Sequence, residues 1–354
     1  MEDRPRAQGD KPGSMGRPPF PPRVAPRQLD AVDQKLRAES LAVGAEDYRS
    51  LPDGDFSPTE WTAAFDEKAD VEVDGITGSF RCYFSGNRDR NIALIFLHGG
   101  GQSALSWGVC SRQLKEQLRD SDVQLVAYDA RGHGATTAIP EDDLSAERMV
   151  EDAVQLIHTL FSNRHESHQI VLVGHSMGAA VATRVAIRTD LGVELRGLVN
   201  IDVVEGTAMD ALPHMSAFLH LRPASFKTQN EAIKYMVTSG QLRKLESAKL
   251  SVAPQLRFEV ERGVYGWRTD LEATGKHWKG WFSGMSQLFL SVPVMKLLVL
   301  AGVDRLDKAL MIAHMQGKFQ NHVIPTAGHA VHEDEPEAVS QLLTSFMQRN
   351  RLLQ

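Results

Sequence analysis

Short apolar runs recur along the chain from residue 71 almost to its end, and segments with helical periodicity separate them. The later runs are nearly continuous, which is typical of parallel strands that helices cover on both faces. Strands that alternate with helices predict a doubly wound α/β sheet flanked by helices. The eight predicted strands are residues 71–73, 80–84, 92–97, 123–128, 170–173, 195–201, 294–301 and 322–325.

Two of the predicted helices have recognisable first residues. Residues 145–161 begin at Ser145, which is an N-cap candidate, and residues 336–348 begin with Pro336, which suits the first turn of a helix. Both segments carry apolar residues at helical spacing, so each is expected to cover the sheet with one face.

The length of 354 residues fits one α/β domain with insertions. Residues 1–50 hold seven of the sixteen prolines and few large apolar side chains, so they predict a disordered Pro/Arg-rich tail. The folded domain is expected over residues 51–354. Within it, residues 205–290 are too long for a simple crossover and are rich in aromatic residues, so we interpret them as a cap insertion over one end of the sheet.

The composition excludes several classes of function. A formal net charge of −6 argues against nucleic acid as the ligand, because phosphate binding needs a basic surface. The apolar runs are far shorter than the ~20 residues that cross a membrane, and the first residues contain no apolar signal segment. Two cysteines in so long a chain are typical of a reducing compartment. We expect a cytoplasmic protein, with the nucleus as an alternative that the basic tail permits.

The sequence Gly174-His175-Ser176-Met177-Gly178 is the sharpest chemical signal. It matches G-x-S-x-G and stands between an apolar strand and an Ala-rich helix, which is the context that this motif requires. The glycines permit a tight turn that lifts the serine oxygen above the sheet edge, near the positive end of the new helix. Ser176 is therefore the predicted nucleophile.

A serine hydroxyl is a weak nucleophile at neutral pH and needs a general base within hydrogen-bond reach. His329 follows the last predicted strand on a Gly-flanked loop, from which a base can reach the sheet edge. His332 lies nearer the final helix and is expected to face solvent. We therefore expect His329 to be the base.

The acid that orients the base has two candidate positions. Asp202 ends the strand 195–201, whereas Asp304, with Asp307 close behind, follows the strand 294–301. Both strand ends lie on the same edge of the predicted sheet, so this geometry leaves the choice open.

The sequence His98-Gly99-Gly100-Gly101 follows a predicted strand and matches an oxyanion-hole motif. Backbone N–H groups can stabilise a tetrahedral intermediate there, and the expected donors are Gly100, or its neighbour Gly101, and Met177. No phosphate-binding, nicotinamide or flavin fingerprint accompanies these glycines, so no cofactor is expected. No metal is expected either, because the chain has neither an H-E-x-x-H nor a C-x-x-C sequence.

Longer stretches resemble the protein phosphatase methylesterase family of α/β-hydrolases. They are FSPTEWTAAFDEKADVEV (56–73), FLHGGGQSALSW (96–107), LVGHSMGAAVA (172–182), NIDVVEGTAMDAL (200–212), WFSGMSQLFLSVPVMKLLVLAGVDRLDK (281–308) and AGHAVHEDEP (327–336). Together they span nearly everything after residue 55, and the run at 200–212 is much more specific than the serine motif. The resemblance implies the α/β-hydrolase fold with a mostly parallel, eight-stranded sheet.

The resemblance also implies a site and a reaction. It assigns the acid to Asp202, the nucleophile to Ser176 and the base to His329. The implied substrate is the methyl ester on the C-terminal leucine of the protein phosphatase 2A catalytic subunit, and the products are a free carboxylate and methanol. The family resemblance further implies binding to the inactive phosphatase and a triad that can be rearranged until the phosphatase docks.

The chain departs from the family pattern at two places. Residues 252–265 are short and mildly charged where members can carry a long acidic insertion, so a docking role of that insertion does not carry over to this chain. Ala179 stands where a third glycine is common after the serine. Alanine fits if the backbone there is helical, so we expect little effect.

Other functions remain open beside the implied one. The first is a small-molecule carboxylesterase, and the second is a hydrolase-like protein that acts mainly by binding the inactive phosphatase. The aromatic side chains of the cap insertion, Trp278 and Trp281 among them, are candidates for the groove that holds the substrate tail. We expect a monomer that binds the phosphatase catalytic subunit and neither nucleic acid nor membrane.

Overall fold

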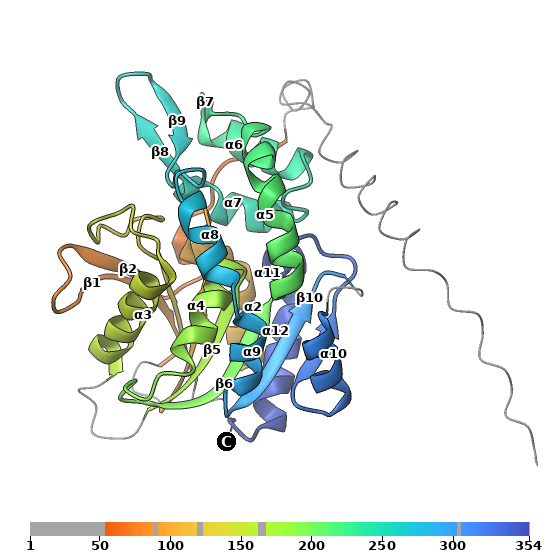
Figure 1. Ribbon diagram of the computed structural model, residues 1–354. Coiled ribbons are helices and arrows are strands. Elements are labelled where there is room, and N and C mark those ends of the chain that lie inside the picture. The colour runs from red at the N-terminus through yellow and green to blue at the C-terminus, as the bar shows by residue number, and fades with distance from the viewer. Residues whose placement is uncertain (1–53, 88–90, 119–122, 162–167, 303–305, 354) are drawn as a thin grey trace, which may run out of the picture. The chain divides into compact units, whose positions relative to one another are not determined.

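The computed structural model describes residues 54–87, 91–118, 123–161, 168–302 and 306–353, and the tail predicted over residues 1–50 lies outside them. The described residues form an eight-stranded sheet in the order β1-β2-β4-β3-β5-β6-β10-β11 (Figure 1). Its strands are β1 (Glu67–Glu72), β2 (Ser79–Ser85), β3 (Ile92–Leu97), β4 (Val123–Tyr128), β5 (Gln169–His175), β6 (Glu194–Ile201), β10 (Met295–Leu300) and β11 (Gln320–Val323).

Strand direction divides the sheet into two parts. β2 pairs antiparallel with β1 and β4, whereas the neighbours from β4 to β11 pair in parallel. Each strand overlaps one of the predicted runs, so the mostly parallel α/β sheet is confirmed.

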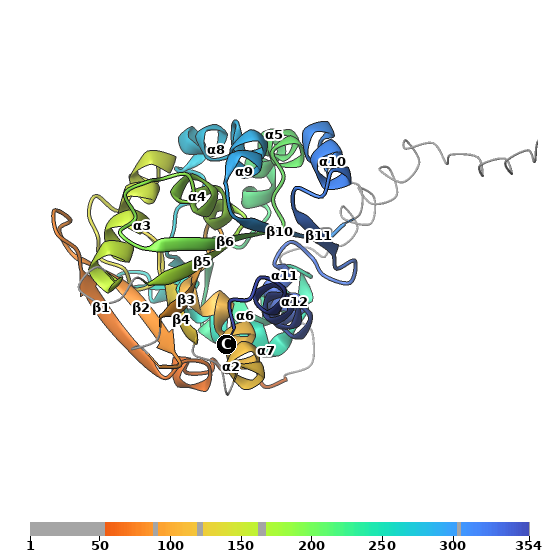
Figure 2. The same cartoon turned by 90° about the horizontal axis from the view of Figure 1, so that it is seen from below.

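Helices on both faces explain why the strands are so apolar. Every residue of β3 and β4 is buried, because neither strand has a face toward solvent. Alternate residues of β3 join apolar clusters on opposite faces: Ala93, Ile95 and Leu97 join one, and Ile92, Leu94 and Phe96 join the other. The first face is covered by α3 (Ala146–Phe161), α4 (Met177–Val185) and α9 (Met285–Ser291), and the second by α2 (Gly108–Gln117) and α12 (Pro336–Arg349) (Figure 2).

The two helices with predicted first residues begin where the sequence indicates. α3 begins after Ser145, whose hydroxyl oxygen accepts a hydrogen bond from the backbone N–H of Arg148 at 3.3 Å. α12 begins with Pro336, which has no N–H to leave unpaired in the first turn.

The segment between β6 and β10 contains the predicted cap insertion. In order along the chain it holds α5 (Glu205–His220), β7 (Ser225–Phe226), α6 (Gln229–Thr238), α7 (Leu245–Ser251), β8 (Leu256–Glu259), β9 (Val264–Trp267), α8 (Gly275–Phe282) and α9. Among the described residues, β7, β9 and β8 form a small sheet of their own. The departure at residues 252–265 lies mainly in the β8–β9 hairpin.

Among the aromatic side chains of the cap insertion, Trp278 and Trp281 do not line an open groove. Their side chains are buried in the apolar cluster that α8 shares with α3 and α4. The Trp278 indole N–H donates to Thr274 Oγ1 (2.8 Å), and that of Trp281 donates to the backbone oxygen of Leu144 (2.7 Å). A buried indole needs such a partner for its N–H, and the large apolar ring favours the interior.

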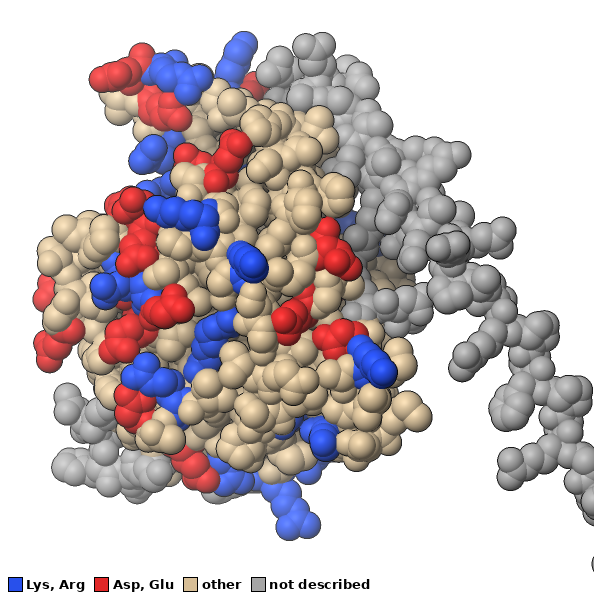
Figure 3. All heavy atoms as spheres, in the orientation of Figure 1, with Lys and Arg blue, Asp and Glu red and all other residues tan. Residues whose placement is uncertain are grey.

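The surface carries mixed charge. Figure 3 shows Lys and Arg side chains interspersed with Asp and Glu side chains over the face drawn there. In the described part of the chain, no helix combines the length and the apolar character needed to cross a membrane.

Candidate active site

The predicted site residues follow the carboxyl ends of strands. β5 ends at His175, and Ser176 lies in the turn before α4 with φ 50° and ψ −117°. Asp202 directly follows β6 and also has a φ of 50°. His329 lies on the loop between β11 and the short helix α11 (Val331–Asp334). Because β5 and β6 are parallel neighbours, Ser176 and Asp202 reach the same edge of the sheet.

The structure brings Ser176, His329 and Asp202 together in one hydrogen-bonded chain. His329 Nε2 lies 3.1 Å from Ser176 Oγ, and His329 Nδ1 donates to Asp202 Oδ2 at 2.8 Å. The Asp202 side chain is fully buried, whereas the His329 side chain is 62% exposed. With its proton on Nδ1, the imidazole presents the Nε2 lone pair to the serine hydroxyl, which is the arrangement a general base needs.

The geometry also distinguishes the candidate acids. The second oxygen of Asp202, Oδ1, accepts the backbone N–H of Ala301 at 2.9 Å, so the carboxylate is held from both sides. Asp307 instead accepts the N–H of Leu310 at 2.9 Å and caps α10 (Lys308–Met315). Asp304 lies outside the described residues.

Both glycines of the serine motif are sterically required. A Cβ on Gly174 would lie 2.5 Å from the Cα of Ala179, and a Cβ on Gly178 would lie 2.3 Å from the backbone oxygen of Leu97. Contacts this short with backbone atoms cannot be relieved by a side-chain movement. Ala179 itself lies inside α4 and is fully buried, so an alanine is accommodated there.

The glycine loop after β3 has one backbone N–H without an acceptor among the described residues. Gly99 N–H donates to Gln102 Oε1 (2.9 Å), and Gly101 N–H donates to His133 Nε2 (2.9 Å). In the described part of the chain no acceptor is found for the N–H of Gly100 or of Met177, the first residue of α4. Of the two glycines predicted as alternatives, Gly100 is therefore the one whose N–H is open.

His332 is not where the sequence indicates, because its side chain is fully buried rather than facing solvent. It lies in α11, and its ring stacks on Trp107 with the ring centroids 4.0 Å apart. The ring of His332 also lies near that of His175, with the centroids 4.6 Å apart. Neither of its ring nitrogens has a hydrogen-bond partner among the described residues. The pKa of His332 is well below the ordinary value of 6.5. Burial is the largest cause, and the nearby histidines lower the pKa further.

We expect His332→Phe to stabilise the protein, and more so in acid. A phenyl ring keeps the stacking on Trp107 and removes two unpaired polar atoms, which should raise the free energy of unfolding by about 1–2 kcal/mol at pH 7.5. The unfolded wild type takes up a proton on His332 below about pH 6.5, whereas the folded state does not. The free energy of unfolding of the wild type therefore decreases as the pH is lowered. The advantage of the variant should grow by roughly 2 kcal/mol between pH 6.5 and 5.

Urea denaturation of both proteins at the two pH values measures this effect. The matched control is His322→Phe, because His322 is an exposed histidine on β11. An advantage of His332→Phe that stays constant or shrinks toward pH 5 would contradict the assignment of a buried neutral ring.

Sequence reasoning missed several polar residues behind the site. Burial lowers the pKa of His98 to about 3 and that of His133 to about 4, so both rings are neutral. His98 Nδ1 donates to the backbone oxygen of Gly99, and its Nε2 accepts the N–H of Ala130. Histidines next to Gly-rich turns, in HGGG and RGHG, were the available signal. Nowhere in the described chain do three or more His, Cys, Asp or Glu side chains gather as metal ligands.

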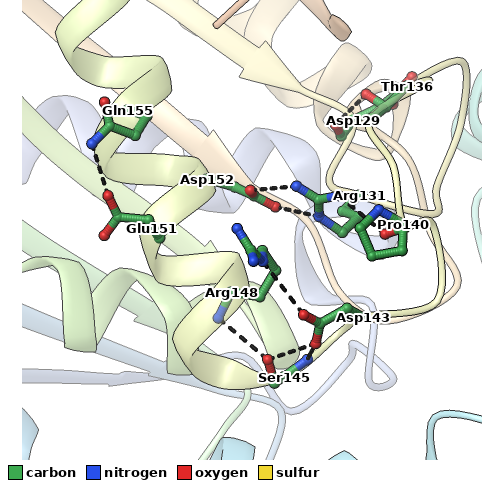
Figure 4. A network of polar contacts seen from close by, with 10 residues as sticks. All are labelled: Asp129, Arg131, Thr136, Pro140, Asp143, Ser145, Arg148, Glu151, Asp152 and Gln155. Carbon is green, nitrogen blue, oxygen red and sulfur yellow. Dashed lines mark hydrogen bonds and ion pairs between the residues drawn. The ribbon is translucent and has the colours of Figure 1, made fainter. Parts of the chain in front are cut away.

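A buried ion pair lies close to the glycine loop and α4. Arg131 and Asp152 form two parallel hydrogen bonds of 2.7 and 2.6 Å, and both side chains are almost fully buried (Figure 4). Arg131 also donates to the backbone oxygen of Pro140 (3.0 Å). Burial raises the pKa of Asp152, and the hydrogen bonds from Arg131 oppose that rise. The pair lines a small internal cavity together with His98 and Met177.

Comparisons with known proteins agree with this geometry. A family model described as "Alpha/beta hydrolase family" matches residues 94–342. The human protein phosphatase methylesterase 1 is 42% identical over 340 residues, which cover 84% of this chain and 86% of the human protein. The Schizosaccharomyces pombe protein of the same name is 37% identical over 329 residues, covering 92% of this chain and 95% of the yeast protein.

Solved structures share the fold at lower identity. E-2-(acetamidomethylene)succinate hydrolase superimposes with a TM-score of 0.63 at 22% identity and covers 80% of this chain and 99% of its own. An esterase of M. tuberculosis superimposes with a TM-score of 0.59 at 20% identity and covers 88% of this chain and 97% of its own. These likenesses concern the fold alone, whereas the sequence relatives identify the family. The chain belongs to the protein phosphatase methylesterase family of α/β-hydrolases.

Proposed function

We propose that this protein is a serine carboxylesterase that removes the methyl ester from the C-terminal leucine of the protein phosphatase 2A catalytic subunit. The observation that carries the proposal is the chain of hydrogen bonds from Ser176 through His329 to Asp202 at the strand ends. Relatives named protein phosphatase methylesterase 1, at 37–42% identity over most of the chain, support the substrate.

In the first half of the reaction, His329 takes the proton of Ser176 while the serine oxygen bonds to the ester carbonyl carbon. Asp202 keeps the imidazole proton on Nδ1 and stabilises the imidazolium that forms. The carbon–methoxy bond then breaks, and the methoxy oxygen receives the proton from His329 and leaves as methanol. An acyl-enzyme remains, in which the leucine carbonyl is bonded to Ser176.

In the second half, a water molecule gives a proton to His329 and attacks the acyl carbon. The bond to Ser176 breaks, the serine oxygen recovers its proton, and the leucine leaves with a free carboxylate. In both halves the N–H groups of Gly100 and Met177 are the proposed donors to the oxyanion. Removing one such donor typically costs ~3 kcal/mol of transition-state stabilisation.

The geometry of the triad indicates what docking of the phosphatase contributes to the reaction. The family resemblance implies a triad that can be rearranged until the phosphatase docks, yet here the three side chains are already within hydrogen-bond distance. In this arrangement, docking serves to deliver the ester. Contacts away from the reacting group would hold the C-terminal segment of the phosphatase against Ser176. The expected monomeric state and the cytoplasmic or nuclear location stay predictions.

Mass spectrometry of the phosphatase C-terminal peptide tests the proposal. The C-terminal peptide of methylated phosphatase should lose the mass of one CH2 group after incubation with this protein, because a hydrogen replaces the methyl group, and methanol should appear in equal amount. In heavy-oxygen water, the new carboxylate should carry one heavy oxygen, because water attacks the acyl carbon. Hydrolysis of simple esters with an unchanged phosphatase peptide would favour the small-molecule esterase. Phosphatase binding without any hydrolysis would favour the binding protein.

A further inference from the structure

Gln102 is the first residue after the HGGG sequence, and its side-chain amide contacts three separate parts of the site. Its Oε1 accepts the N–H of Gly99 at 2.9 Å and lies 3.0 Å from His175 Nδ1. Its Nε2 donates to Glu333 Oε1 at 2.8 Å. One half-buried amide therefore bonds to the glycine loop and to α11, which follows the base, and it also contacts the residue before the nucleophile.

The first of these contacts fixes the glycine loop. A backbone N–H can only donate, so the end of the amide that faces Gly99 must be the oxygen, and the nitrogen must then face Glu333. On the other side of Gly100, the N–H of Gly101 is held by His133. Gly100 thus lies between two N–H groups that are both engaged, so the direction of its own N–H is set by its neighbours.

The other contacts reach the loop that carries His329. His175 Nε2 lies 2.9 Å from the backbone oxygen of His329, and Glu333 lies in the turn of helix that follows it. Burial lowers the pKa of His175 to about 3, so the neutral ring carries one N–H, which either tethers His329 or donates to Gln102. The His329 side chain is largely exposed and has little packing of its own. Its position therefore depends on contacts of its backbone, such as that with His175.

Glu333 suits a role as the neutral acceptor of this amide. Its side chain is fully buried, and burial raises its pKa to about 8. The backbone oxygen of Glu333 accepts the hydroxyl of Ser247 in α7 at 2.6 Å, which fixes α11 against the cap insertion. The amide of Gln102 is thereby anchored to a rigid part of the fold.

We propose that Gln102 is a positioning residue, whose side-chain amide sets the glycine loop relative to the His329 loop, so that the oxyanion donor faces the carbonyl group that Ser176 attacks while His329 accepts the serine proton. This proposal rests on the proposed esterase function. A misplacement of about 1 Å at a reacting group can cost on the order of 10²-fold in rate. The amide should affect chemistry rather than substrate binding, because its hydrogen-bond contacts are with Gly99, His175 and Glu333.

The test uses Gln102→Met, which keeps the length of the side chain and removes its hydrogen bonds. We expect kcat to fall by roughly 10- to 100-fold for both methylated phosphatase and p-nitrophenyl acetate, with KM changed by less than about 3-fold. A boronic acid that forms a tetrahedral adduct with Ser176 should bind more weakly by a similar factor. The matched control is Gln117→Met, because the Gln117 amide joins α2 to α12 through Ser340 and Thr344 away from the triad. This control should leave kcat unchanged.

A second pair of variants keeps the test decisive if Gln102→Met does not fold. Glu333→Leu removes the acceptor of the amide and should lower kcat as Gln102→Met does, whereas Glu333→Gln retains a neutral acceptor and should restore most of that loss. Wild-type kcat in Gln102→Met, or equal kcat in the two Glu333 variants, would overturn the positioning role and leave the esterase proposal intact. A wild-type protein that hydrolyses neither ester would overturn both.

Discussion

Replacing Ser176 by alanine should lower the rate of phosphatase demethylation by at least about 10⁴-fold, because loss of a triad nucleophile leaves only the oxyanion hole and substrate binding. His329 and Asp202 keep their own 2.8 Å hydrogen bond in this variant, so the fold and phosphatase binding should persist. The rate is measured by mass spectrometry of the phosphatase C-terminal peptide, and binding by co-purification with the phosphatase.

Ser176→Gly provides a matched comparison. Ser176 has a φ of 50°, a conformation that glycine adopts more readily than serine. The glycine variant should therefore be as inactive as Ser176→Ala and yet raise the free energy of unfolding by about 1 kcal/mol. Demethylation that survives in either variant would disprove Ser176 as the nucleophile.

Arg131→Met should lower the free energy of unfolding by about 3–5 kcal/mol, because it leaves the buried carboxylate of Asp152 without its counter-ion. Burial, the largest influence on Asp152, is then no longer opposed by Arg131 and holds the pKa of that carboxyl above the unfolded value. A group whose pKa is raised on folding loses stability as the pH rises, so the deficit of the variant should be larger at pH 8 than at pH 5. Urea denaturation at both pH values measures it.

Two further variants isolate the buried charge. Arg188→Met removes ion pairs with Asp190 and Glu151, but these pairs are at the surface, and the expected loss is below about 1 kcal/mol. Arg131→Met combined with Asp152→Leu removes both charges and should recover much of the lost stability. If the double variant is no more stable than Arg131→Met alone, the cause is lost packing around Arg131 rather than an unpaired carboxylate.

Local patterns predicted the features that depend on neighbouring residues. The continuous apolar runs predicted the strands because helices cover both faces, as β3 illustrates. The spacing of Gly174 and Gly178 around Ser176 predicted the turn because the backbone of α4 and the end of β3 leave no room for a Cβ.

Features that depend on contacts between distant parts of the sequence could not be predicted from local patterns. His332 looked like a surface residue because nothing near it in the sequence reveals Trp107, on which its ring lies. The hydrogen bond between Gln102 and Glu333 joins residues 231 positions apart, and no periodicity encodes it. Spacing also left Asp202 and Asp304 equivalent, and only the family resemblance favoured Asp202 before the hydrogen bond with His329 was known.

The place where the chain leaves the sheet has an evolutionary consequence. β6 and β10 are parallel neighbours, yet α5 to α9 and the small three-stranded sheet of the described residues lie between them in the sequence. The segment between β6 and β10 can therefore be lengthened, shortened or exchanged during evolution without altering the order of the strands in the large sheet. Selectivity for a new ester can then arise by gain or loss of residues above the strand ends, while the nucleophile and its base stay in place.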